Sequence, residues 1–111
     1  MTHRVITPRT RPLHALVHVP GSKSVAARAL ICAALSDDPS VVSNLPSGDD
    51  TSAMLAGLQQ LGAVMHVVGS SAEFTGSLSL ESAHSVVVDA ALAGTTARFL
   101  TAVAALRNGE T

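Results

Sequence analysis

Residues 20–35 read PGSKSVAARALICAAL. The proline and glycine at the start are typical of a turn, and Ser24 to Leu35 consists mostly of strong helix formers. Ser22 or Ser24 is expected to cap this helix, because a serine oxygen accepts a hydrogen bond from a free N–H group of the first turn. Before the turn, Ala15 to Val19 alternates weakly and is rich in valine, which favours a strand.

A second helix is predicted after Ser47, the expected cap. Asp49 and Asp50 would occupy its first turn, where the helix dipole favours anions, and Gly62 is placed to end it. Its apolar stripe consists of Met54, Leu55, Leu58 and Leu61.

The other elements are short strands and a third helix. The strands expected from the pattern are Val41–Val42, a hairpin of Ala63–Val68 with Glu73–Thr75, and Ser85–Asp89, with Gly76–His84 as loop or weak strand. The helix is expected over Gly94–Leu106, with Leu100, Val103 and Leu106 facing inward. This order predicts an α/β or α+β fold in residues 15–111, preceded by an extended leader in residues 1–14.

The composition excludes several classes of protein. Aromatic residues make up only 2%, which argues against a base-stacking surface for nucleic acid. No uncharged apolar run approaches the roughly 20 residues of a membrane helix, and no signal peptide is evident. The single cysteine, Cys32, is expected to be buried, and a cytoplasmic protein is expected.

Charge is distributed unevenly along the chain. Residues 1–36 contain five basic residues and no acid, whereas residues 37–111 contain two basic and eight acidic residues. Three of the five lie in the leader, where a solvated tail is the simplest interpretation. The other two are Lys23 and Arg28.

The turn at residues 20–24 has the groups of an anion site. A helix start offers free N–H groups, Gly21 allows a close backbone approach, and Lys23 adds a full charge. Ser24 and Arg28 share one helix face. The spacing is not that of a Walker A loop. A capped helix with a solvated lysine explains the same residues equally well.

A second turn of similar design precedes the third helix. Gly94 and Thr95 open it, and Arg98 lies one turn further on. From the residues alone, the favoured interpretation is that Thr95 caps the helix and Arg98 pairs with an acid such as Asp50. Asp49 and Asp50 could form a catalytic acid/base pair, but the favoured interpretation is that they are ordinary acids in the first turn of the helix.

The histidines do not indicate a metal site. His14 and His18 would face the same side of a short strand, but no cysteine or acid has ligand spacing to them. A zinc site is therefore not expected.

Taken together, three motifs resemble the 5-enolpyruvylshikimate-3-phosphate synthase family. The first is Pro20–Ser24 followed by Arg28-Ala29-Leu30. The second is Leu45–Thr51 with Leu61-Gly62-Ala63, and the third is Ala93-Gly94-Thr95 with Arg98. They occur in the family's order and spacing, over about Leu16 to Thr111.

The resemblance implies an enzyme without metal or organic cofactor. It would transfer the enolpyruvyl group of phosphoenolpyruvate to the 5-hydroxyl of shikimate 3-phosphate and release phosphate. Lys23 would contact both substrates and act in catalysis, Ser24 and Arg28 would bind shikimate 3-phosphate, and Gly94 would bind phosphoenolpyruvate, near where glyphosate binds. Asp50, Thr95 and Arg98 would have supporting roles.

The resemblance also implies a fold and an extent. The family fold is a two-domain inside-out α/β barrel of repeated units, and the parent enzyme is expected to be a monomer. Residues 15–111 would form one unit and the start of the next, so the chain is expected to be an N-terminal fragment that is inactive alone.

Two positions depart from the family pattern, and two alternatives stay open. Ala27 and Leu92 stand where the family has asparagine. One alternative is a non-catalytic anion-binding or interaction module. The other is the sister family that uses UDP-N-acetylglucosamine, although Ser22 and Ser24 favour the shikimate branch.

Overall fold

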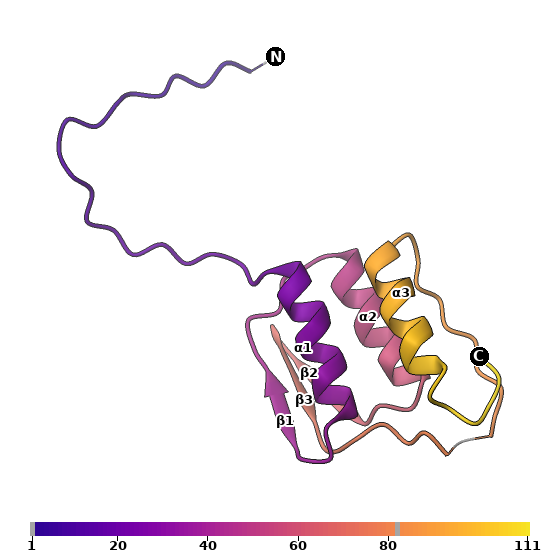
Figure 1. Ribbon diagram of the computed structural model, residues 1–111. Helices are drawn as coiled ribbons and strands as arrows, with labels where there is room; N and C mark the ends of the chain where they lie inside the picture. The colour runs from indigo at the N-terminus through magenta and orange to yellow at the C-terminus, as the bar shows by residue number, and fades with distance from the viewer. Residues whose placement is uncertain (1, 82) are drawn as a thin grey trace.

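The computed structural model describes residues 2–81 and 83–111 and shows a mixed α/β unit with an extended N-terminal segment (Figure 1). Its elements are α1 (Lys23–Leu35), β1 (Ser40–Val42), α2 (Asp49–Gln60), β2 (Met65–Val68), β3 (Ser71–Phe74) and α3 (Gly94–Ala104). The expected α/β class is confirmed. The predicted helices, the strand at 41–42 and the hairpin are all present, and their ends differ from the predicted ends by at most two residues.

The sheet has three antiparallel strands in the order β1-β3-β2. Phe74 is paired with Ser40 on one side and Met65 on the other, and the register places Glu73 between Val41 and His66. Phe74 is buried, whereas Glu73 is exposed. One face of the sheet therefore packs on the core and the other faces solvent.

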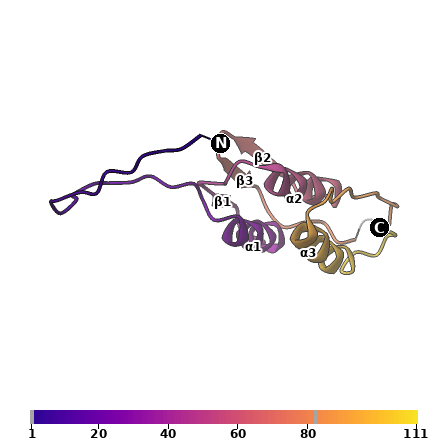
Figure 2. The ribbon, with the colours of Figure 1, turned by 90° about the horizontal axis from the view of Figure 1, so that it is seen from above.

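The three helices lie side by side, with their N-terminal ends at the same end of the unit (Figures 1 and 2). Small side chains and a glycine allow them to approach closely, since a Cβ built at Gly57 of α2 would overlap Leu100 of α3. The core contains Leu30, Met54, Leu58 and Leu100 among its buried residues. Alanines contribute much of this core, among them Ala26, Ala33 and Ala34 of α1.

The predicted strand at Ala15–Val19 is wrong. These residues are exposed, form no strand, and belong to a segment that extends away from the helices (Figure 1). His14 and His18 therefore do not share a strand face. An alternating pattern forms a stable strand only where a neighbouring strand takes up its backbone hydrogen bonds, and within the described residues none lies beside this segment.

The predicted strand at Ser85–Asp89 is also wrong. In this segment the N–H group of Val86 donates to the carbonyl of Glu110 at 3.1 Å, but no strand pairing develops. The described residues of Gly76–His84 are irregular, and the position of Ser82 lies outside the described residues.

Three smaller predictions are corrected at the helices. Cys32 is exposed, because it lies on the face of α1 that is turned away from the core. Helix α3 ends at Ala104, and Leu106 is 54% exposed instead of facing inward. The N-cap of α2 is Gly48 instead of Ser47, and it makes no side-chain cap bond. Gly62 ends α2 with a φ of 107°, as predicted.

Candidate functional site

The turn at residues 20–24 packs on the chain's own backbone. A Cβ built at Gly21 would overlap the carbonyl oxygen of Asn44. Ser22 caps α1, its Oγ accepting the N–H group of Val25 at 3.4 Å. The glycine is therefore needed for contact with the loop at Asn44. Its close approach to a ligand stays a prediction.

A cleft of about 150 Å³ lies where the N-terminal ends of the three helices meet. Each helix contributes polar groups: Lys23 and Ser24 from α1, Asp50 and Thr51 from α2, and Thr95 and Thr96 from α3. The apolar residues Ala27, Leu30 and Met54 complete its lining. A water molecule needs roughly 10–15 Å³ of such volume, so the cleft has room for a phosphate-sized group.

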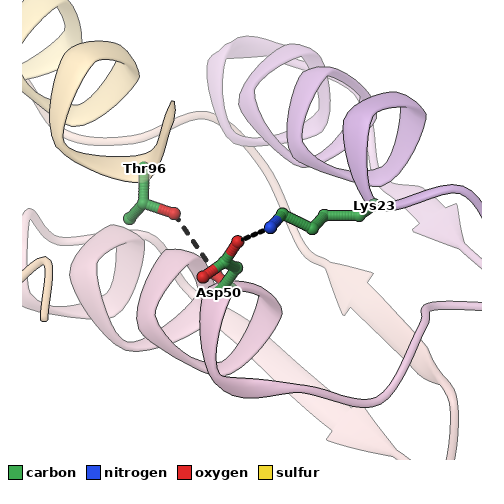
Figure 3. A network of polar contacts seen from close by, with 3 residues as sticks. All are labelled: Lys23, Asp50 and Thr96. Carbon is green, nitrogen blue, oxygen red and sulfur yellow. Dashed lines mark hydrogen bonds and ion pairs between the residues drawn. The ribbon is translucent and has the colours of Figure 1, made fainter. Parts of the chain in front are cut away.

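A network of polar contacts joins the three helix starts (Figure 3). The ammonium group of Lys23 forms an ion pair with the carboxylate of Asp50, and the Oγ1 hydroxyl of Thr96 donates to the backbone carbonyl of Asp50 at 3.2 Å. Thr96 is 2% exposed, whereas the side chains of Lys23 and Asp50 are 65% and 31% exposed. The ion pair therefore lies at the solvent-exposed side of the cleft, and the hydroxyl of Thr96 lies at its buried side.

This network corrects one sequence-based expectation. Arg98 was expected to pair with Asp50, but Lys23 is the partner of that carboxylate. Arg98 is exposed and, in the part of the chain that the structure describes, has no ion-pair partner. It lies one turn into α3 and is not among the residues that line the cleft.

Arg28 lies outside the cleft lining but contacts it through Ser24. Its Nη1 donates to the Ser24 carbonyl at 2.9 Å and to the Ser24 hydroxyl, as expected for residues one helical turn apart. The guanidinium also lies 5.4 Å from the centre of the Phe99 ring, a cation–π distance that ties α1 to α3. Arg28 is thus held beside the cleft.

The N-terminus of α3 is the least neutralised of the three. Its N-cap is Ala93, without a side-chain cap bond, and its first turn carries no acid. By contrast, α1 is capped by Ser22, and α2 has Asp49 and Asp50 in its first turn. The predicted capping role of Thr95 is therefore wrong. The free N–H groups and dipole of α3 remain available to an anion.

Gly94 is the first residue of α3 and faces open space. A Cβ built there would meet no atom within 4 Å. Any side chain at this position would extend into that space, beside the free N–H groups of the helix. The geometry agrees with the predicted close approach of a ligand at Gly94, which stays a prediction.

The structure therefore brings four of the predicted residues to one cleft: Lys23, Ser24, Asp50 and Thr95. Gly94 adjoins the cleft, Arg28 touches Ser24, and Arg98 stands apart. Sequence reasoning missed Thr96 as a member of the site. The sequence signal for Thr96 was its position next to Thr95. Its hydrogen-bond partner, Asp50, lies 46 residues earlier and could not be identified from the sequence.

The fold and the cleft define a mixed α/β unit with the hydrogen-bond donors that an anionic ligand requires. Among the described residues, no helix is long and apolar enough to span a bilayer. The family model described as EPSP synthase (3-phosphoshikimate 1-carboxyvinyltransferase) matches residues 8–111, so the chain belongs to this family.

Curated relatives agree with the family match. A 3-phosphoshikimate 1-carboxyvinyltransferase of Clostridium perfringens strain SM101 is 35% identical over 106 residues, which cover 96% of this chain and 24% of that protein. The protein of the same name from Opitutus terrae is 39% identical over 103 residues, covering 90% of this chain and 24% of the relative. For Kocuria rhizophila the identity is 37%, over 89% of this chain and 24% of the relative. The chain thus spans about a quarter of the length of these relatives.

Proposed function

We propose that this chain supplies the N-terminal part of a 3-phosphoshikimate 1-carboxyvinyltransferase. The enzyme transfers the enolpyruvyl group of phosphoenolpyruvate to the 5-hydroxyl of shikimate 3-phosphate and releases phosphate. One observation carries the proposal: two of the family's motif turns, at Lys23 and at Gly94–Thr95, lie beside one cleft at three helix N-termini. Family membership supports these two substrates as ligands of the cleft.

The chemistry of the cleft suits these substrates. Both are phosphorylated carboxylates, and helix N-termini with a nearby cation favour such groups. The addition of the hydroxyl to phosphoenolpyruvate gives a charged tetrahedral intermediate before phosphate leaves. Lys23 and the free N–H groups of α3 are placed to stabilise that charge.

The two substrates share Lys23 and otherwise bind different residues. Shikimate 3-phosphate binds Lys23, Ser24 and Arg28, and phosphoenolpyruvate binds Lys23 and Gly94. Asp50 and Thr95 support the cleft from α2 and α3. For phosphoenolpyruvate to bind, the ammonium of Lys23 has to divide its contacts between Asp50 and the substrate, because it forms an ion pair with Asp50.

The two departures from the family pattern have different surroundings. Ala27 lines the cleft, where a methyl group offers no hydrogen bond to a substrate. Leu92 is fully exposed, so it adds apolar surface before Gly94 where the family has an amide. We propose that the backbone N–H groups of α3 take over phosphate contacts in this region.

The proposed place of the chain in the whole enzyme follows from the family fold. Residues 15–111 form one repeated unit and the start of the next within a two-domain inside-out α/β barrel. The relatives are about four times as long, and the rest of the site then comes from segments beyond the quarter that this chain matches. The 111 residues alone are accordingly inactive.

The test replaces Lys23 in the full-length protein, expressed from the reading frame that encodes this chain. Phosphate release from phosphoenolpyruvate and shikimate 3-phosphate is measured for the wild type and for Lys23→Met. A charge-assisted contact contributes about 1.5–3 kcal/mol, so kcat/KM is expected to fall at least about ten-fold.

Arg11→Met is the matched control. It removes the same charge from an exposed residue of the N-terminal segment, which is not part of the cleft lining. It is expected to keep the wild-type kcat/KM. A folded wild-type protein that releases no phosphate would contradict the proposed function, and equal effects of the two substitutions would contradict the role of Lys23.

A further inference from the structure

The buried hydroxyl of Thr96 on α3 is linked to the ammonium of Lys23 through Asp50. Thr96 is 2% exposed, and its Oγ1 donates to the backbone carbonyl of Asp50 in the first turn of α2. The carboxylate of the same Asp50 holds the ammonium of Lys23 at the start of α1. Figure 3 shows the three residues in this order, one from each helix.

The hydroxyl of Thr96 reaches another helix because of its place near a helix start. A threonine inside a helix commonly donates to the carbonyl four residues earlier, as Thr101 does to Ala97 at 2.7 Å. For Thr96 that residue is Leu92, which precedes the helix. The hydroxyl instead uses the carbonyl of Asp50, which fixes the start of α3 against the start of α2.

The contribution of the ion pair to stability is small, which points to a positional role. Exposed ion pairs are worth about 0–1 kcal/mol, and the side chain of Lys23 is 65% exposed. A lysine has four rotatable bonds, so an unpaired ammonium would sample a wide volume at the mouth of the cleft. Pairing with Asp50 restricts it to the side of α2.

We infer that Thr96 is a positioning residue, which acts through Asp50 to set the distance between the Lys23 ammonium and the free N–H groups of α3. This inference rests on the proposed function, in which those two groups bind parts of the same reacting substrates. Thr96 lines the cleft, but its hydroxyl donates to the backbone carbonyl of Asp50, so we assign it to positioning and not to substrate binding. Misplacing one of the two groups weakens stabilisation of the transition state more than binding of the ground state.

The test compares variants at Thr96 in the full-length protein, with kcat and KM measured for both substrates. Thr96→Val keeps the shape of the side chain and removes the hydroxyl. A misplacement of about 1 Å costs up to about 100-fold, so a fall in kcat of about ten-fold is expected, with each KM changing less than about three-fold. Thr96→Ser, which restores the hydroxyl, is expected to recover most of the loss.

Two further variants keep the result interpretable. Thr101→Val removes an exposed hydroxyl that bonds only within α3, and kcat is expected to stay within about two-fold of the wild type. If Thr96→Val fails to fold, Thr96→Ala against Thr96→Ser takes its place, because these two differ only in the hydroxyl.

The outcomes separate this inference from the proposed function. A wild-type protein that releases no phosphate overturns the proposed function and this inference with it. An active wild type whose Thr96→Val variant keeps its kcat overturns this inference alone. The same holds if Thr96→Ser loses as much as the variant without a hydroxyl, since the loss then comes from packing.

Discussion

At the scale of single residues, the main electrostatic feature of the cleft is the ion pair between Lys23 and Asp50. Lys23 is the only lysine in the chain, and its ammonium is already paired with Asp50. The charges of Lys23 and Asp50 thus offset each other in the cleft lining, and the start of α3 attracts an anion with no acid in its first turn to oppose it. An anionic substrate has to share Lys23 with Asp50, which favours binding to the backbone of α3 and to Lys23 together.

A left-handed alanine precedes that helix start. Ala91 has a φ of 50°, and its N–H group donates to Oδ1 of Asp89 at 2.8 Å. An L-residue in this region costs roughly 1–2 kcal/mol, and glycine avoids the cost at an entropic penalty of about 0.5–1 kcal/mol. Ala91→Gly is therefore expected to raise the thermal midpoint by a few degrees, measured by circular dichroism.

The neighbouring Ala90 gives the control for this prediction. Ala90 is not among the residues with a positive φ, so Ala90→Gly adds only the entropic penalty and is expected to lower the midpoint. If both substitutions lower the midpoint equally, then the left-handed conformation of Ala91 carries no strain.

The sequence predicts the composition of the site better than its contacts. Lys23 and Ser24 are local neighbours in a turn, and a turn followed by a helix can be recognised from residue types alone. The partner of Asp50 depends on tertiary packing, and the choice between Arg98 and Lys23 could not be made without it. The role of Thr96 was missed for the same reason, because its partner belongs to another helix.

At the scale of elements, the helices were predictable and the isolated strands were not. A helix satisfies its own backbone hydrogen bonds, so strong helix formers between recognisable ends suffice to place α1. A strand depends on a neighbour. The hairpin of β2 and β3 supplies its own partner and was found, whereas Ala15–Val19 and Ser85–Asp89 have suitable residues but form no strand.

Two glycines mark where elements approach closely, and the same substitution separates their roles. At Gly57, a Cβ would meet the end of the Leu100 side chain, which can rotate, and alanine gains about 1 kcal/mol of helix propensity. At Gly21, the obstacle is the backbone of Asn44, which cannot rotate away. Gly21→Ala is expected to lower the free energy of unfolding by about 1–3 kcal/mol, and Gly57→Ala by less than about 1 kcal/mol.

Urea unfolding of Gly21→Ala and Gly57→Ala measures the free energy of unfolding that each variant loses. Both substitutions add a single methyl group, and they differ in what that methyl group meets and in the helix propensity that alanine gains at Gly57. A larger loss for Gly57→Ala would show that the contact between α2 and α3 is less adaptable than the contact at the turn.

At the scale of the whole molecule, packing divides the chain near Pro20, within its basic N-terminal third. The described residues before Pro20 are exposed, and in that part of the chain none of them forms a hydrogen bond or ion pair with the α/β unit. The molecule is 64 Å along its longest axis, which includes this segment. Three of the five basic residues of the N-terminal third lie here, and only Lys23 and Arg28 belong to the unit that forms the cleft.

Removal of residues 2–19 from the 111-residue chain tests this division. The described residues of the segment are exposed and extend away from the unit (Figure 1). Their removal is therefore expected to change the thermal midpoint by less than about 2 °C, whereas 1 kcal/mol corresponds to about 4–8 °C in a domain of this size. Gly21 and Ser22 stay in place, so the contact with Asn44 and the cap of α1 are kept. A fall of 5 °C or more, about 1 kcal/mol, would mean that the segment packs against the unit in solution and that the alternation at Ala15–Val19 serves a strand within this chain. An unchanged midpoint would assign these apolar side chains to contacts outside the unit, as the exposure of Leu16, Val17 and Val19 indicates.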